Sequence, residues 1–220
     1  MALSVSDLER RIATLEREQR ANTVMTRVAN PAAMRGLGVE NLYGAVKLIG
    51  GVLKHSIIAS SAAIANSAAE TAFDQTLSLG ANDLNQVGAL LRIRASGIYS
   101  VTGTPTITLK FRIDGTGVDG EVLAELQLTA PSGVSNFGWA LESSSIVRAL
   151  GTAITLKNGF AIGGLNGVDA RTAVKTTAVS IDSQAPHTIY GTVQFGAADP
   201  ANTITLETFT AEVLYPGRYD

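Results

Sequence analysis

Apolar and polar residues alternate strictly from Thr106 to Ile113. A period of two is typical of a β-strand with one face on a hydrophobic core and the other in water. The apolar positions are expected to face the core: Ile107, Leu109, Phe111 and Ile113. In the preceding arm, residues 91–96 alternate in the same way, and the link 102–105 contains a glycine, which tolerates positive φ, and a proline, which cannot donate to a ladder. The pattern therefore predicts a β-hairpin over residues 89–113, with Lys110 on its water-facing side.

Further short apolar segments are bounded by Gly, Pro, Asn or Asp. They lie at 54–64, 72–79, 122–128, 137–147, 153–165, 174–181, 187–195 and 203–215. With the hairpin arms they make about ten strands, and since no helical pattern separates them, an antiparallel β-sandwich or jelly roll is favoured over an α/β fold. In the last segment the apolar phase changes after Leu206, which predicts a bulge near Glu207 and Thr208.

The first residues of the chain predict a short helix. Ser6 and Glu9 fit a capping box, so the helix is expected to run from about Asp7 to about Arg20. Its apolar stripe has the spacing of a two-heptad coiled coil: Val5, Leu8, Ile12 and Leu15. Because a helix this short is marginal alone in water, we expect the stripe to bind a second copy or another protein. The alternative is that it packs on the chain's own sheet.

These patterns predict three regions. Residues 1–30 form a coiled-coil or anchoring helix, residues 31–53 form a neck, and residues 54–220 form the β-sandwich. The neck contains Pro31, several glycines and short apolar pieces around Tyr43 and Ile49. Apolar residues are unusual in a free linker, so we expect them to be buried against a partner subunit or the base of the sandwich. The predicted fold class is mostly β, an antiparallel jelly-roll-like β-sandwich preceded by a short N-terminal coiled-coil helix.

Charge and composition narrow the choice of partners. Lys and Arg number 17 and Asp and Glu 19, a formal net charge of -2, so neither nucleic acid nor an anionic membrane is an expected partner. The N-terminus lacks an apolar signal core, and no run reaches the roughly 18 apolar residues of a membrane span, so we expect a soluble protein made in a cytoplasm. The absence of cysteine excludes disulfides and cysteine zinc sites.

The segment Gly115–Gly120 matches the dinucleotide-binding expression G-x-G-x-x-G. The preceding strand alternates, whereas a dinucleotide-fold strand is buried on both faces, so we interpret the segment as a glycine-rich hairpin loop. The acidic residues Asp114, Asp119 and Glu121 would make this loop the first place to look for a metal, but Thr116 and Val118 stand where an EF-hand requires ligands.

Other catalytic candidates are scattered. Only His55 and His187 could serve as histidine bases or ligands, and His187 follows Pro186 at a strand start, where an exposed structural role is expected. Six carboxylates lie on loops or polar faces without a pattern that selects a pair: Asp83, Glu125, Glu142, Asp169, Asp182 and Glu207. The sequence therefore predicts a non-enzymatic protein with no catalytic residue, no cofactor and no metal site.

Two groups of runs stand out near the ends of the predicted sandwich: 66–76, 81–84, 91–100 and 102–106 at its opening, and 202–206 and 211–214 at its close. These runs resemble a β-sandwich module of tailed-bacteriophage structural proteins. The resemblance covers about residues 54–215 and is carried by fold signatures rather than by active-site residues. It departs from the module in two loop features, namely Leu79-Gly80-Ala81 in place of Ile-Pro-Ala and the lack of an acidic residue after Gly88.

The resemblance implies a virion structural protein that is assembled in the host cytoplasm. Such modules are typically heads of tail fibres, minor tail proteins or capsid spikes, displayed by an N-terminal segment and often homotrimeric. We therefore expect attachment to other virion proteins through the N-terminal segment, with host surface glycans as a candidate contact of the head. The alternatives are a capsid decoration or cement protein and, third, a polysaccharide depolymerase head. Ile12 and Leu15 favour a two-stranded coiled coil, whereas the resemblance favours a trimer, which we expect the sandwich to determine.

Overall fold

The computed structural model describes residues 51–57, 59–152, 154–166, 168, 170–173 and 178–215. These residues form strands and no helix, and hence no helix that could span a membrane. The strands are β1 (Gly51–Ser56), β2 (Ile64–Ala65), β3 (Thr71–Leu79), β4 (Leu90–Val101), β5 (Thr106–Ile113), β6 (Glu121–Thr129), β7 (Val134–Val147), β8 (Ile154–Leu165), β9 (Arg171–Ala173), β10 (Val179–Ile181), β11 (His187–Phe195) and β12 (Thr203–Leu214). The predicted N-terminal helix, including Val5, Leu8, Ile12 and Leu15, lies outside the described residues.

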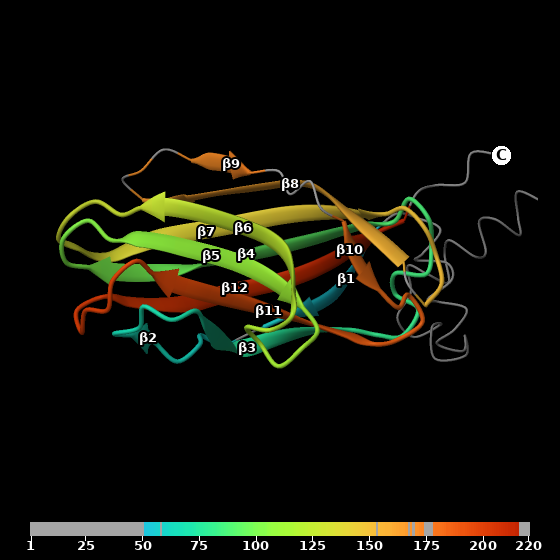
Figure 1. Cartoon of the computed structure of the whole chain (residues 1–220), viewed down its shortest axis with the longest axis horizontal. Coiled ribbons are helices and arrows are strands. Elements are labelled where there is room, and N and C mark those ends of the chain that lie inside the picture. The colour runs from blue at the N-terminus through green and yellow to red at the C-terminus, as the bar shows by residue number, and fades with distance from the viewer. Residues whose placement is uncertain are drawn as a thin grey trace, which may run out of the picture. The chain divides into compact units, whose positions relative to one another are not determined.

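The strands form two antiparallel sheets that face each other (Figure 1). The larger sheet has the order β1-β12-β4-β7-β8-β10, with β2 paired to β12 and β9 paired to β8. The smaller sheet has the order β3-β11-β5-β6. Successive strands cross repeatedly between the sheets, for example from β3 to β4, from β4 to β5 and from β11 to β12. The mostly-β, antiparallel fold class predicted from the sequence is confirmed for the described residues, and the crossings are typical of jelly-roll-like sandwiches.

The core lies between the two sheets and contains the inward residues of both. The alternation of β5 is confirmed, because Ile107, Leu109, Phe111 and Ile113 are all buried. Aromatic rings tie the sheets together: Phe111 stacks on Phe209 with ring centroids 5.8 Å apart. A second pair, Phe73 and Trp139, stacks at 5.9 Å. These contacts join β5 to β12 and β3 to β7. In β5, the residues that alternation assigns to the inward face are therefore the ones that pack between the sheets.

The predicted hairpin over residues 89–113 is wrong. Strand β4 pairs with β12 and β7 in the larger sheet, whereas β5 pairs with β11 and β6 in the smaller one. The link 102–105 therefore crosses from one sheet to the other. Alternation specifies which face of a strand is buried but not which strand lies beside it, and two half-wet strands can bury their apolar faces against each other across a sandwich.

The predicted bulge in the last strand is confirmed, since the register of β12 against β4 shifts between Leu206 and Thr208. Next to it, the indole nitrogen of Trp139 on β7 donates a hydrogen bond of 2.9 Å to the carbonyl oxygen of Thr205 on β12. The bond reaches over Gly97 of the intervening strand β4. A Cβ atom at Gly97 would lie 1.9 Å from the Thr205 oxygen and 2.8 Å from the indole nitrogen. Only a residue without a side chain fits this crossing.

The first and last strands meet at one end of the sandwich, which we call the base. Gly51 of β1 pairs with Leu214 of β12, so both ends of the described domain lie there (Figure 1, right). The β5–β6 loop, residues 114–120, lies at the end of β5 that points toward the base, near the middle of the sandwich in Figure 1. The links β4–β5 and β11–β12, residues 102–105 and 196–202, lie at the opposite end, which we call the far end. Any segment that precedes Gly51 therefore joins the sandwich at the end opposite these two links.

Candidate functional site

The outer face of the smaller sheet carries a cluster of charged residues around Glu70. Arg112 binds the Glu70 carboxylate with two nitrogens: Nε donates to Oε1 at 2.6 Å and Nη2 to Oε2 at 2.8 Å. Thr192 Oγ1 donates to Oε1 at 2.6 Å, and Lys110 Nζ lies 3.0 Å from Oε2. Arg112 also donates to the carbonyl oxygen of Gly120 at 2.6 Å. This Glu70 cluster fixes the segment before β3 on β5 and β11.

Ionised Glu70 is favoured despite its burial. Burial by itself raises the pKa of the Glu70 carboxyl, but the hydrogen bonds from Arg112, Thr192 and Lys110 outweigh it and lower the pKa from 4.5 to about 2. The same carboxylate raises the pKa of Arg112. Every polar atom of the carboxylate is therefore engaged in holding the fold, which makes this cluster structural rather than a poised acid or base.

The Glu70 cluster predicts a loss of stability in acid. Because the folded pKa is depressed, its contribution is complete above pH 4.5 and is lost as the pH falls to about 2. The pKa difference between 4.5 and about 2 corresponds to about 3 kcal/mol in the free energy of unfolding. We expect Glu70→Gln to be less stable than the natural chain at pH 6 by about this amount in urea unfolding. The gap should shrink as the pH approaches 2, and a gap independent of pH would contradict the assigned role.

Lys110 is less exposed than the sequence pattern indicates. It lies on the water-facing side of β5, as predicted, but its side chain is only 13% exposed, because it lies 3.0 Å from Glu70 and 3.3 Å from Glu125. A Lys110→Ala substitution is therefore expected to weaken the Glu70 cluster and is not the neutral change that strand phase alone suggests.

His187 is buried, in contrast to the exposed role expected from its place at a strand start. Its Nδ1 lies 2.8 Å from a carboxylate oxygen of Asp114, and its Nε2 lies 2.6 Å from the carbonyl oxygen of Asp182. The ring therefore ties the β5–β6 loop to the β10–β11 loop. Both ring nitrogens are occupied by oxygen atoms of the protein itself, which suits a structural link.

The Gly115–Gly120 segment is a hairpin loop between β5 and β6, as interpreted from the sequence. Asp114 is bound by His187, and the carboxylate of Asp119 accepts hydrogen bonds from the backbone and side chain of Thr116. The bond from the Thr116 amide is the main reason that the pKa of Asp119 is lowered. The acidic groups of this loop thus shape its turn, and among the described residues no three metal-ligating side chains gather anywhere.

The scattered carboxylates have separate local roles. Asp83 Oδ2 accepts from the Gly80 amide at 2.8 Å, and Asp182 accepts from the Gln184 amide at 2.9 Å. Glu125 pairs with Lys110, and Glu207 accepts hydrogen bonds from Ser60 and Thr205. Asp169 lies outside the described residues. The structure does not bring these groups together, and Glu142 lines a hollow in the surface.

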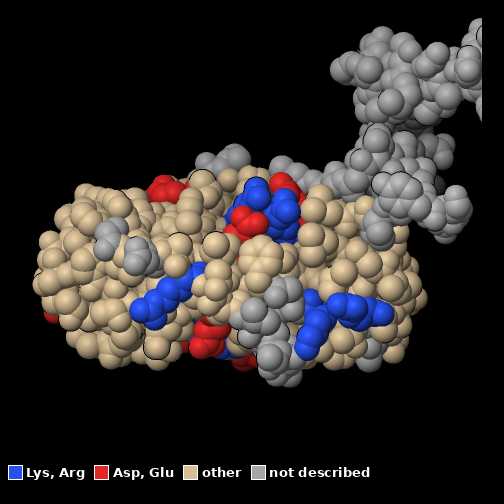
Figure 2. Space-filling model, turned by 90° about the horizontal axis from the view of Figure 1, so that it is seen from above, with Lys and Arg blue, Asp and Glu red and all other residues tan. Residues whose placement is uncertain are grey.

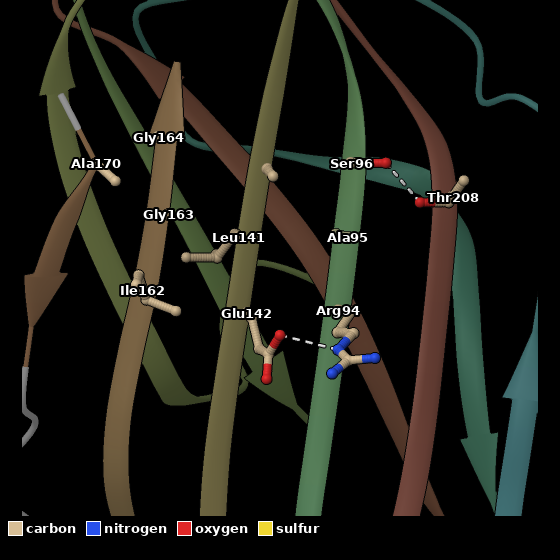
Figure 3. Close-up of a pocket in the computed structure, with 11 residues that line it drawn as sticks. Arg94, Ala95, Ser96, Leu141, Glu142, Ile162, Gly163, Gly164, Ala170 and Thr208 are labelled. Atoms are coloured by element: carbon tan, nitrogen blue, oxygen red, sulfur yellow. Dashed lines mark hydrogen bonds and ion pairs between the residues drawn. The ribbon is translucent and has the colours of Figure 1, made fainter. Parts of the chain in front are cut away.

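That hollow is a groove of about 440 Å³ on the larger sheet, where β12, β4, β7 and β8 lie side by side (Figure 3). It is open to solvent and is lined mainly by small and polar residues: Arg94, Ala95, Ser96, Ala140, Leu141, Glu142, Ile162, Gly163, Gly164, Ala170 and Thr208. Two interactions cross it. Arg94 Nε donates to Glu142 at 2.9 Å, and the hydroxyls of Ser96 and Thr208 share a hydrogen bond of 2.6 Å. We call it the sheet groove.

Charges near the sheet groove are balanced among themselves. Arg92 lies 3.5 Å from Glu142 and 3.6 Å from Glu212, and Arg94 pairs with Glu142. Two cations thus face two carboxylates. Figure 2 shows another face of the molecule, on which charged residues form only small groups among uncharged ones. The described residues on the face in Figure 2 form no broad basic surface of the kind that nucleic acid requires.

Sequence reasoning missed the sheet groove. Most of its residues are water-facing positions of four strands, and the small size of several is visible in the sequence as Ser96, Ala140, Gly164 and Thr208. Small residues at water-facing positions are common, so their presence in the sequence does not by itself indicate a groove. The register of β12, β4, β7 and β8 is what places these four residues in one row.

No family model and no curated protein matches the sequence. Solved structures that are similar include the CBM2 module of the evolved Dit of Lactobacillus casei BL23 phage J-1, at 11% identity over 66% of this chain and 70% of that one, with a TM-score of 0.32. The PL-14 alginate lyase from Aplysia kurodai is 7% identical over 75% of this chain and 100% of that one, with a TM-score of 0.33. The Gx strain structure of infectious bursal disease virus is 11% identical over 77% and 46%, with a TM-score of 0.24. These values are too low to carry an argument about function.

Proposed function

We propose that this chain is a non-enzymatic structural protein of a tailed-phage virion, of the tail-fibre or minor-tail type. Residues 1–53 attach it to other virion proteins, and the β-sandwich is the displayed head. The observation that carries the proposal is the common position of Gly51 and Leu214 at the base. A head joined to its support at one end exposes the loops of its far end and the outer faces of its sheets, as a displayed module requires.

The residues behind the phage-module resemblance support the same proposal through their roles in loops. The carbonyl oxygen of the Asn202 side chain accepts from the Thr102 amide at 3.1 Å, and the Thr102 hydroxyl donates to Asp199 at 2.9 Å. Together these bonds tie the two far-end links to each other. Thr102 and Asn202, which lie in the runs that resemble the phage module, thus shape the far-end links, a role expected in a structural head.

Electron microscopy of the phage particle, labelled with gold-tagged antibodies to the full chain, tests the location. Label on the tail supports the proposal. Label distributed over the capsid lattice would instead favour the decoration or cement alternative. Incubation of the full chain with polysaccharide of the host surface tests the third reading, because release of reducing sugar would identify a depolymerase and contradict the non-enzymatic role.

We expect the full chain to be a homotrimer by light scattering at micromolar concentration. A chain shortened to begin at Gly50, where the compact unit of the sandwich starts, should remain trimeric if the sandwich determines assembly. A monomeric short chain would assign assembly to the N-terminal segment and its stripe of Val5, Leu8, Ile12 and Leu15. A monomeric full chain would leave assembly to the virion lattice and favour the cement alternative.

A further inference from the structure

We propose that the sheet groove binds an uncharged saccharide chain. The inference builds on the proposed display of the sandwich, since a displayed head can meet surface polysaccharide, but its test needs only the purified protein. The argument rests on the shape of the sheet groove, on the hydroxyls in its floor and on the pairing of its charges.

The floor of the sheet groove is a row of small residues that crosses four strands. Thr208 pairs in register with Ser96, Ser96 with Ala140, and Ala140 with Gly164. Neighbouring strands are about 4.8 Å apart, so the row spans about 14 Å. At the Gly164 end, a Cβ on this glycine would meet Ala170 at 3.4 Å, so Ala170 covers that end. The floor is thus an elongated hollow, which suits a chain-like ligand.

Along one side of this row of small residues, larger side chains form a wall of the sheet groove. The neighbouring row of the sheet contains Arg94, Glu142 and Ile162, which are consecutive partners in the register. The side chains of Arg94 and Glu142 are joined by one hydrogen bond (Figure 3), and Ile162 is 38% exposed. A saccharide has polar hydroxyls at its rim and apolar C–H groups on its faces. This wall offers both charged polar groups and an apolar surface to such a molecule.

The hydroxyls of the floor favour a ligand that both donates and accepts. Each hydroxyl has one donor and two acceptor sites, and the bond between Ser96 and Thr208 uses only one donor and one acceptor. One hydroxyl proton and several lone pairs stay available to a ligand in the sheet groove. Sugar hydroxyls have the same dual character. Because Arg92 and Arg94 already face Glu142 and Glu212, the sheet groove gives an ionic ligand little unbalanced charge to bind.

Two other occupants fit less well. An extended peptide binds a sheet through free backbone groups at an edge, whereas β4, β7 and β8 are interior strands whose backbones pair on both sides. A second copy of the sandwich would need close complementary packing over roughly 800 Å² per partner, and a flat sheet face laid over the sheet groove would leave the 440 Å³ hollow largely unfilled.

The test uses the full chain and a panel of neutral hexasaccharides of glucose, mannose and galactose, with hexagalacturonate as the charged counterpart, in titration calorimetry. We expect binding of at least one neutral member. Ala140→Leu places a larger side chain in the floor and should weaken this binding at least tenfold. The matched control Ala197→Leu makes the same change at an exposed position of the far-end link and should leave affinity unchanged.

A second variant keeps the proposal testable if Ala140→Leu fails to fold. Ser96→Ala combined with Thr208→Ala removes the floor hydroxyls without adding volume, and we expect a loss of roughly tenfold. Binding of no neutral member, or binding that survives both variants, would overturn the proposal. If hexagalacturonate alone bound, and Arg94→Ala abolished that binding, the proposal of an uncharged ligand would be overturned. If Ala140→Leu lowered the molecular mass of the assembly in solution, the sheet groove would be an interface between copies and the saccharide proposal would be overturned as well. None of these results depends on where the protein lies on the particle.

Discussion

Gly97→Ala is expected to destabilise the sandwich by more than about 4 kcal/mol and to prevent folding of much of the protein. The added Cβ would lie 1.9 Å from the carbonyl oxygen of Thr205 and 2.8 Å from the indole nitrogen of Trp139. The first of these is a backbone atom of the neighbouring strand, so no rotamer change can relieve the clash. Either the pairing of β4 with β12 opens or the hydrogen bond from Trp139 is lost. Urea unfolding measures the loss, with the fluorescence of the single tryptophan as the signal.

Gly138→Ala is the matched control. Gly138 lies on the adjacent strand β7, and a Cβ there would have no neighbour closer than the Gly97 carbonyl oxygen at 4.0 Å. We expect its stability to stay within about 1 kcal/mol of the natural chain. Equal stability of the two alanine variants would contradict the close approach of β12 to β4 at the bulge.

Phe111→Ala is expected to cost about 3–5 kcal/mol. The ring is fully buried, and it stacks on Phe209 of the opposite sheet, so truncation leaves a cavity between the sheets as well as removing apolar area from the core. Chemical denaturation of the purified variant measures the cost, and near-ultraviolet circular dichroism reports on the aromatic packing.

Phe160→Ala provides the control for the same chemical change at the surface. The Phe160 side chain on β8 is 43% exposed, so its removal should cost less than about 1 kcal/mol. If both truncations cost the same, the assignment of Phe111 to the interior of the sandwich would be wrong. Lys110, on the outer face of the same strand as Phe111, is unsuitable as a control because it belongs to the Glu70 cluster.

The sequence predicts well whatever depends on one strand and its own faces. The inward phase of Phe111 and the bulge after Leu206 follow from the local order of apolar residues, because a buried face imposes a period of two and a bulge reverses it. Pairing between strands is different. The β4–β5 hairpin was wrong because residues 102–105 can join strands of one sheet or of two, and the alternation of both arms satisfies either arrangement.

The polar contacts were harder to predict, because their partners are distant in sequence. Arg112 and Glu70 are 42 residues apart, and His187 and Asp114 are 73 apart. No spacing rule connects such residues before the register of β5, β11 and β3 is known. For His187 one signal was present: it is in phase with the buried Ile189 and Val193 of its own strand, which indicates an inward side chain. The preceding proline obscured that phase by marking the strand start.

The antiparallel pairing of β1 with β12 has a mechanical consequence. Gly51 faces Leu214 at the base, and Ser56 faces Thr210 further along the strand. If the sandwich is held through the segment before Gly51 and pulled at its far end, the tension runs along β1 and loads its hydrogen bonds to β12 together, in shear. Tension between Gly51 and Leu214 would instead open the same ladder one bond at a time. With the anchor proposed above, the strongest direction of the β1–β12 ladder would lie along the axis on which a head bound to a cell surface is pulled.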